Sequence, residues 1–448
     1  MASCAAALQR QGYHVTGSDQ GAYPPMSTFL ESEGIQIVSP YTEENLAHKP
    51  DLVVIGNALS RGNPEVEAVL DQKLPYCSLP ELLKEFFIRG KRSIVITGTH
   101  GKTTTTSLMA WVFETAGLNP SFLIGGVPLN FGFGARFTES DWIIMEGDEY
   151  DTAFFDKRSK FVHYLPEIGI INNLEFDHAD IFTDLAAIQL SFKRFINIVP
   201  RNGLLLINGE ERNLESITKV DHCPIQSFGL NSENHFSAED VKLGPEGSEF
   251  TVQGNRYSLP MVGRLNIRNA LAVISCALHC GIPVEQIQAA LASFQGIKRR
   301  MEIRATVNDI TIIDDFGHHP TAIQETIEAL RLGYPDRHIW VAFEPRSNTT
   351  RRNVFQHELA AALAGADAVL ISQVARLHLL EEHQRLNPEQ LVNDIREAER
   401  DCHYYEDADQ ICDHLTEHCQ PGDVVCIFSN GAFGHLHEKF EASLKAKT

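Results

Sequence analysis

Short apolar runs recur along the whole 448-residue chain, and most of them end in a glycine or a polar residue. Runs this short are typical of strands that are buried on both faces of a parallel sheet. Helix-like stretches such as residues 103–116 separate them, so the pattern predicts an α/β chain. The predicted strands lie at residues 51–56, 93–97, 142–146, 168–172, 203–208, 310–314, 338–343, 368–372 and 423–428.

The predicted elements fall into three groups, which we expect to be three domains. Residues 1–88 predict a small Rossmann-like domain. Residues 89–297 predict a central P-loop mononucleotide-binding domain with a parallel sheet, and residues 298–448 predict a second Rossmann-like domain. Within the central domain, short alternating segments at residues 228–259 predict an antiparallel excursion.

The first residues of the chain predict only part of a βα unit. A helix at residues 3–11 is followed by a strand at residues 14–17, which is the order expected in the second half of such a unit. The first strand and Gly-rich turn of such a unit are missing before this helix, and whether the native protein has them stays open.

The strand at residues 93–97 runs into a glycine loop that is followed by a helix. Backbone amides at the N-terminus of a helix bind phosphate, so we expect Lys102 to reach the β/γ-phosphates of ATP and Thr103 to ligate Mg²⁺. The spacing departs from the usual P-loop, because Ile96 stands where the first glycine is expected. The alternative is a Gly-rich turn with a surface lysine, which the flanking strand and helix disfavour. The predicted nucleotide-binding residues are Gly98, Thr99, His100, Gly101, Lys102, Thr103 and Thr104.

Acidic side chains follow the strand at residues 142–146. Hard divalent cations prefer oxygen ligands, and Glu146 at the strand end is the first candidate for a metal ligand. For Asp148, Glu149 and Asp151, a position in a solvated acidic loop is an equally good alternative. His178, in a polar segment after another buried strand, is a second candidate, although a hydrogen-bonded structural histidine is the alternative. We predict a Mg²⁺ site and a catalytic group with these members: Thr103, Glu146 and His178 as metal ligands, and Lys102, Glu146 and His178 as catalytic residues.

Further polar pairs lie in the second half of the chain. Asn266 and Asn269 are one helical turn apart and could read an adenine edge, although helix capping by Asn266 is the favoured alternative. Arg300 and Asp315 could reach a nucleotide bound between domains. The adjacent His318 and His319 are a weak metal signal because neighbouring side chains diverge.

Charge and composition exclude several classes of protein. Lys and Arg total 38 against 59 Asp and Glu, and the net charge of -21 disfavours a nucleic-acid partner. The chain has no apolar run of about 18 residues, so we expect no membrane partner and a cytoplasmic location. Nine dispersed cysteines are typical of reduced thiols. The oligomeric state stays open.

Together these motifs resemble the Mur ligase superfamily over essentially the whole chain. Its members carry G-T-[HN]-G-K-T-[ST], a metal-binding Glu after a strand, Asp-His, G-x-x-N-x-x-N, and an Arg and an Asp in the last domain. The matching positions here are Gly98 to Thr104, Glu146, Asp177-His178, Asn266, Asn269, Arg300 and Asp315. Leu265 stands where many relatives have His, and we do not assign Lys193 as a carbamylated lysine.

The resemblance implies an ATP-dependent, ADP-forming ligase with Mg²⁺. Residues 57–64 and 315–321 are similar to the branch that acts on UDP-N-acetylmuramate, and residues 149–163 and 343–349 favour an L-Ala-γ-D-Glu-meso-diaminopimelate acceptor, as in peptidoglycan recycling. The implied substrate-binding residues are Ser18, Asp19, Asn57, Ser60, Arg61, His318 and Arg346. The alternatives are a UDP-N-acetylmuramate–L-alanine ligase and, in another class, a P-loop kinase or a nucleotide-dependent regulator.

Overall fold

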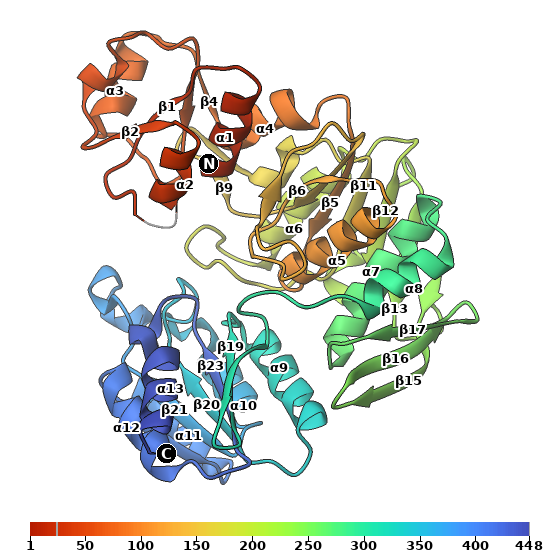
Figure 1. Cartoon of the computed structure of the whole chain (residues 1–448), viewed down its shortest axis with the longest axis vertical. Helices are drawn as coiled ribbons and strands as arrows, with labels where there is room; N and C mark the ends of the chain where they lie inside the picture. Colours follow the sequence, from red (N-terminus) through yellow and green to blue (C-terminus); the bar gives the residue numbers. More distant parts are fainter. Residues whose placement is uncertain (24–25, 448) are drawn as a thin grey trace.

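The computed structural model describes residues 1–23 and 26–447, which form three lobes along the chain (Figure 1). In the N-terminal lobe the strands are three residues long and form two parallel pairs, β1 with β2 and β3 with β4, rather than one continuous sheet. The elements of this lobe are α1 (Ala2–Arg10), β1 (Thr16–Ser18), α2 (Met26–Ser32), β2 (Gln36–Val38), β3 (Val53–Ile55), α3 (Pro64–Asp71), β4 (Tyr76–Ser78) and α4 (Leu79–Leu83).

The central lobe is built on an eight-stranded sheet in the order β14-β13-β12-β11-β5-β8-β6-β7. Neighbouring strands are parallel except for β6 and β7. The strands are β5 (Arg92–Thr97), β6 (Ser121–Leu123), β7 (Ala135–Arg136), β8 (Trp142–Glu146), β11 (Ile168–Ile171), β12 (Leu204–Asn208), β13 (Ile225–Gly229) and β14 (Phe236–Ser237). The helices are α5 (Lys102–Thr115), α6 (Leu185–Ile196), α7 (Arg264–His279) and α8 (Val284–Ala292).

Two small sheets extend this lobe. β9 (Asp151–Ala153) pairs with β10 (Asp156–Ser159) in an antiparallel ribbon. The predicted antiparallel excursion is present as β15 (Glu239–Gly244), β16 (Gly247–Val252) and β17 (Asn255–Leu259).

The central sheet is buried on both faces, which explains why its strands are continuous apolar runs. Ile94 and Ile96 of β5 pack with helices α5 and α7, while Val95 points to the opposite core, where Phe192 and Phe195 of α6 lie. Ile96 is therefore part of the strand, and the glycine loop begins only after Thr97.

The C-terminal lobe contains a six-stranded sheet in the order β18-β19-β23-β20-β21-β22, in which only the β18–β19 pair is antiparallel. Its strands are β18 (Glu302–Val307), β19 (Ile310–Asp315), β20 (Ile339–Phe343), β21 (Ala368–Ser372), β22 (Asp401–Tyr405) and β23 (Val424–Phe428). Its helices are α9 (Pro320–Gly333), α10 (Gln356–Leu363), α11 (Pro388–Glu397), α12 (Ala408–His418) and α13 (Leu436–Ala446).

The α/β fold class predicted from the apolar runs is confirmed, with a mainly parallel sheet in each of the two larger lobes. The predicted domain boundaries at residues 88 and 297 stay predictions. Among the helices of the described residues, none is both long and apolar enough to span a membrane.

Candidate active site

A cavity of about 580 Å³ lies where the carboxyl ends of strands from the two larger sheets face each other. In open α/β sheets this edge is where ligands bind. Residues from the loops after β5, β8 and β11 form one wall, and residues after β19 and β20 form the other. The predicted residues that line it are Thr99, His100, Gly101, Lys102, Thr103, Thr104, Glu146, His178, Asn266, Arg300, Asp315, His318 and Arg346.

The glycine loop needs its two glycines for different reasons. Gly98 has a φ of 138°, and a Cβ there would lie 3.1 Å from the backbone nitrogen of Asn173. Gly101 is the N-cap of α5 with a φ of 74°, and a Cβ there would lie only 2.5 Å from Oδ1 of Asn269. The loop therefore packs against α7 and the β11 loop with no room for a side chain, and the α5 N-terminus opens into the cavity.

Asn269 supports this loop from behind and does not line the cavity. Its Oδ1 accepts a hydrogen bond from Oγ1 of Thr105 at 3.1 Å, and Asn172 donates to the same hydroxyl at 2.8 Å. Asn266 does line the cavity, and its side chain donates to the Val262 carbonyl at 2.8 Å. The capping interpretation of Asn266 is wrong, because α7 begins at Arg264 with Gly263 as its N-cap.

Lys102, Glu149 and His178 form a buried chain of charged contacts. The Glu149 carboxylate, only 4% exposed, lies 2.9 Å from the Lys102 ammonium and 2.6 Å from Nε2 of His178. Burial opposes ionisation of Glu149, but the charges of Lys102 and His178 prevail and lower its pKa to about 2. Burial likewise acts against the charged forms of Lys102 and His178, and Glu149 raises the pKa of each. The three groups therefore stabilise one another's charged forms in the folded site.

Backbone geometry fixes His178 in this chain. The residue adopts a φ of 54°, a left-handed conformation that is costly for a side chain with a Cβ. The Asp177 carboxylate holds it there by accepting a hydrogen bond from the His178 amide at 2.7 Å. The segment after β11 is therefore shaped to direct this imidazole towards the glycine loop.

Thr103 and Glu146 fit a Mg²⁺ ion. Neighbouring ligand oxygens of an octahedral Mg²⁺ site with bonds of about 2.0–2.1 Å lie about 2.9 Å apart. The Thr103 hydroxyl donates a hydrogen bond of 2.9 Å to Oε1 of Glu146, which sets the two oxygens at this spacing, and the other Glu146 oxygen accepts from the Gly125 amide at 2.6 Å. Burial raises the pKa of Glu146, a cost that a bound cation would relieve. His178 is the third predicted ligand, and its Nε2 contacts Glu149 in this structure. Its role as a Mg²⁺ ligand stays a prediction.

The second wall meets the first through Asp177. Its Oδ1 accepts a hydrogen bond from the Thr349 hydroxyl at 2.7 Å, and its Oδ2 lies 3.8 Å from Nε2 of His318. Despite burial, the neighbouring histidine charges of His178 and His318 keep the pKa of Asp177 well below its usual range. His318 and Asp177 therefore join the two lobes across the cavity.

Arg300 and Asp315 lie on the same wall, beside the aromatic ring of Phe316. Asp315 accepts hydrogen bonds from the amides of Met301 at 2.8 Å and Gly317 at 2.6 Å, which fixes the backbone on both sides of it. The Arg300 guanidinium lies 5.1 Å from the Phe316 ring centre. These positions agree with a role near a nucleotide, which stays a prediction.

Three arginines from the loops after β20 and β21 complete the lining: Arg346, Arg351 and Arg376. Arg351 is 6% exposed, and within the described part of the chain it donates only to neutral acceptors, including the carbonyls of Ser347 at 3.3 Å and Arg376 at 3.4 Å. Burial, followed by the charge of Arg376, lowers its pKa. These three arginines make this wall of the cavity electropositive, although Glu344 lies 3.3 Å from Arg346, and suit it to carboxylates or phosphates.

The predicted residues of the N-terminal lobe do not line this cavity, and lie instead at the ends of β1 and β3: Ser18, Asp19, Asn57, Ser60 and Arg61. Ser18 donates to the Glu65 carboxylate, Asp19 accepts from the Gly21 amide at 2.8 Å, and Arg61 pairs with Glu67 at 2.8 Å. Their role in binding a substrate stays a prediction.

The structure adds site residues that sequence patterns did not single out. Glu149 was one of three equivalent acidic candidates, and only its burial between Lys102 and His178 distinguishes it. Thr349 lies in the segment 343–349 that was used for the acceptor, but neither it nor Glu175 was predicted as a site residue. The predicted divergence of the two adjacent histidines is present, because His318 faces Asp177 while His319 faces Glu175.

Comparison with known proteins gives the same description for all three parts of the chain. The model of the Mur ligase family, catalytic domain, matches residues 1–91, that of the Mur ligase middle domain matches residues 96–277, and that of the Mur ligase, glutamate ligase domain, matches residues 299–431.

Full-length relatives have more specific names. The UDP-N-acetylmuramate–L-alanyl-gamma-D-glutamyl-meso-2,6-diaminoheptandioate ligase of Haemophilus influenzae is 42% identical, covering 100% of this chain and 97% of the relative. The UDP-N-acetylmuramate–L-alanine ligase of Geotalea uraniireducens is 32% identical, covering 99% and 96%. The crystal structure of a murein peptide ligase from Psychrobacter arcticus superposes with a TM-score of 0.71 at 35% identity, covering 99% of this chain and 96% of that one.

Substitution of Gly101 tests the packing of the loop. Gly101→Ala should weaken ATP binding about tenfold or more, because the new Cβ collides with Asn269 and displaces the loop. Isothermal titration calorimetry with ATP measures the loss. Gly117→Ala is the matched control, since Gly117 follows the other end of α5 with a φ of 77° and open space around it. Equal ATP affinities in the two variants would contradict the role of the loop packing.

Substitution of Glu149 tests the buried charge chain. Glu149→Gln should lower the free energy of unfolding by about 1–3 kcal/mol, because Lys102 and His178 lose the carboxylate between them. Urea denaturation followed by tryptophan fluorescence measures the change. Asp151→Asn is the control, because Asp151 pairs with a Lys157 side chain that is 70% exposed, and its loss should cost less than about 1 kcal/mol. A stability loss no greater than that of the control would argue against the buried chain.

Proposed function

Because this chain belongs to the Mur ligase family, we propose that it is an ATP-dependent ligase that joins the carboxylate of UDP-N-acetylmuramate to the amine of L-alanyl-γ-D-glutamyl-meso-diaminopimelate. The observation that carries this proposal is the 42% identity to the Haemophilus influenzae ligase over the full length of both chains. The identity to the alanine-adding relative is lower, at 32%. The family predicted from the motifs is thereby confirmed, and a P-loop kinase or regulator is set aside.

The chemistry proceeds in two displacements. The lactyl carboxylate of UDP-N-acetylmuramate attacks the γ-phosphorus of ATP, which forms an acyl phosphate and releases ADP. The amine of the tripeptide then attacks the acyl carbon, forms the amide and expels phosphate. Both steps pass through highly charged transition states, so the main tasks of the protein are positioning and charge neutralisation.

The glycine loop and its neighbours suit the first displacement. The α5 N-terminus and the Lys102 ammonium present positive charge at one end of the cavity. Glu149 and the carbonyl of Gly98, 2.6 Å from the Lys102 nitrogen, hold this ammonium in place. Thr103 and Glu146 would hold Mg²⁺, which neutralises phosphate charge when bound. His178, the third predicted Mg²⁺ ligand, would lie beside this site through its contact with Glu149.

The electropositive wall suits the acceptor. L-Alanyl-γ-D-glutamyl-meso-diaminopimelate carries three carboxylates, whereas free alanine carries one. Arg346, Arg351 and Arg376 line the cavity beside Asn348 and Thr349. Arginine pairs with carboxylates in a bidentate manner, so this group of cations favours the longer acceptor. The five predicted residues of the N-terminal lobe remain the proposed contacts for the UDP-sugar.

An acceptor panel tests the proposed function. ADP release should require UDP-N-acetylmuramate together with an amine, and the tripeptide should give a kcat/KM at least about tenfold above that of free L-alanine, since one additional charged contact contributes about 1.5–3 kcal/mol. A coupled ADP assay with alanine, di-, tri- and tetrapeptides measures the preference. Faster turnover with free alanine would reject the tripeptide assignment, and ADP release without amide formation would reject the ligase.

Substitution of Arg346 tests the acceptor wall. Arg346→Gln should raise the KM for the tripeptide about tenfold, with the KM for ATP unchanged, because the tripeptide loses a charge-assisted contact that ATP does not make; Glu344 also loses its partner at 3.3 Å. Steady-state kinetics with each substrate varied in turn separates the two constants. Arg337→Ala, which removes a surface arginine 3.4 Å from Asp309, is the control and should leave both constants unchanged. An equal rise in both constants for Arg346→Gln would place this residue outside the acceptor site.

A further inference from the structure

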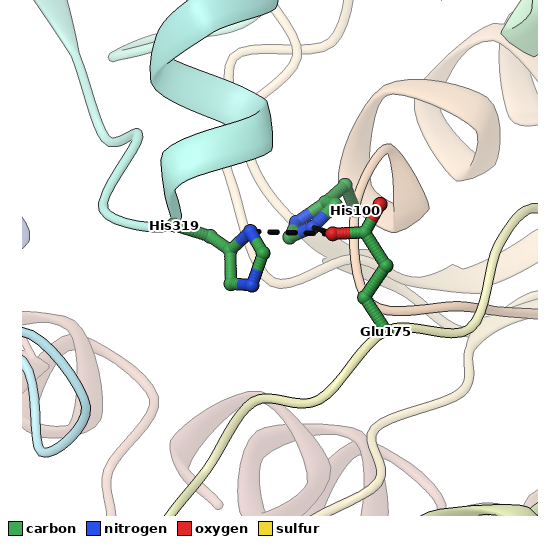
Figure 2. A group of neighbouring side chains, drawn as sticks. All are labelled: His100, Glu175 and His319. Atoms are coloured by element: carbon green, nitrogen blue, oxygen red, sulfur yellow. Dashed lines mark hydrogen bonds and ion pairs between the residues drawn. The ribbon is translucent and has the colours of Figure 1, made fainter. Parts of the chain in front are cut away.

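Two histidines and a glutamate meet beside the glycine loop, outside the predicted Mg²⁺ site. His100 belongs to the loop, Glu175 follows β11, and His319 is the N-cap of α9 in the C-terminal lobe. Figure 2 shows both imidazole rings directed towards the Glu175 carboxylate. Three segments that are distant in sequence thus bring three metal-ligating side chains to one point.

The separations of the ligand atoms fit a small tetrahedral cation. Nε2 of His100 lies 3.3 Å from Oε2 of Glu175, and Nδ1 of His319 lies 3.4 Å from the same oxygen. All three ligand atoms lie within 4.8 Å of one another. Bonds of about 2.0–2.2 Å in a tetrahedral Zn²⁺ site place neighbouring ligand atoms about 3.3–3.5 Å apart. The two shorter separations therefore match this geometry before any rearrangement.

The hydrogen bonds of His319 leave its Nδ1 unprotonated. Its Nε2 lies 3.1 Å from the carbonyl oxygen of Phe176, which can only accept, so Nε2 carries the proton. The amide of Thr321 donates a long hydrogen bond of 3.3 Å to Nδ1, so Nδ1 is an acceptor, and a bound metal ion would take over this lone pair. An imidazole that donates from one nitrogen to a backbone carbonyl is oriented to ligate a metal through the other.

This protonation state places two acceptors against each other. Nδ1 of His319 and Oε2 of Glu175, 3.4 Å apart, have no proton to share, so this pair repels, while Oε2 also lies within hydrogen-bond distance of Nε2 of His100, at 3.3 Å. The Thr321 hydroxyl donates to Oε2 at 2.7 Å and orients the carboxylate without relieving that repulsion. Glu175 is 28% exposed, which leaves one side of the cluster open to solvent. A cation between the three groups would convert the repulsion into attraction.

We propose that His100, Glu175 and His319 form a binding site for a divalent first-row transition metal ion of the Zn²⁺ type, with water as the fourth ligand. Two imidazoles and one carboxylate suit Zn²⁺, whereas Mg²⁺ prefers oxygen ligands and octahedral geometry. The site is thus chemically distinct from the one at Thr103 and Glu146. Because its ligands come from the glycine loop and from α9, a bound ion ties the nucleotide loop to the C-terminal lobe.

Metal binding to the full-length chain tests this site without nucleotide or substrate. Metal-free protein is dialysed against Zn²⁺ in the presence of excess Mg²⁺, and bound zinc is measured by atomic emission. The expected result is one equivalent of zinc that Mg²⁺ does not displace. Co²⁺ should bind at the same place and give the visible absorption of a tetrahedral complex.

The variants are chosen to keep the local fold. Asparagine is a good N-cap, so His319→Asn preserves the start of α9, and the family pattern accepts Asn in place of His100. His319→Asn, His100→Asn and Glu175→Gln should each lose the zinc equivalent and the Co²⁺ spectrum. Glu146→Gln should retain both, as should His357→Ala, which removes an exposed histidine 3.4 Å from Asp394.

The proposal is overturned if the wild-type protein binds no zinc. It is also overturned if the His319→Asn variant still binds zinc while the Glu146→Gln variant does not. Circular dichroism of each variant confirms that it is folded. Since neither ATP nor the muramyl substrate is present, failure of this site leaves the proposed ligase activity unaffected.

Discussion

The segment after β11 holds the two walls of the cavity together. On one side Asn173 accepts a hydrogen bond from the His100 amide at 2.7 Å, and the Glu175 amide donates to the Thr99 hydroxyl at 2.8 Å. On the other side Asp177 accepts from the Thr349 hydroxyl at 2.7 Å. Because one short segment bonds both the glycine loop and the C-terminal lobe, the positions of the two walls depend on each other.

Buried charge strengthens this arrangement. Carboxylate oxygens of Glu149 and Asp177 lie 2.6 Å and 3.9 Å from Nε2 of His178. Removing carboxylates from water is costly unless cations lie nearby, and here Lys102 and the histidines provide that compensation. The groups needed for charge neutralisation are therefore organised by contacts within the protein, before any phosphate enters.

The sequence predicted the elements better than the contacts. Strands such as β5 and β8 are recognisable because burial on both faces requires continuous apolar residues, and the shortened loop follows from Ile96 belonging to the strand. The pairing of Glu149 with His178 was not predictable, because it depends on β5 lying between β8 and β11 in the sheet. Their order along the chain does not reveal this neighbourhood.

The same limit applies to the paired asparagines and histidines. Spacing placed Asn266 and Asn269 on one helix, but only the packing of α5 against α7 shows that Asn269 supports the loop while Asn266 faces the cavity. Likewise, the divergence of His318 and His319 was predictable from their adjacency. The identity of their partners required the position of α9 against the β11 loop.

The electropositive wall also shapes how anionic molecules reach the cavity. A chain with a net charge of -21 repels them at long range, while Arg300, Arg346, Arg351 and Arg376 attract them close to the cavity. At physiological ionic strength fields are screened over about 8 Å, so the distant repulsion is weakened more than the attraction at the cavity mouth. The arginines therefore act on an anionic molecule only over the last few ångströms of its approach.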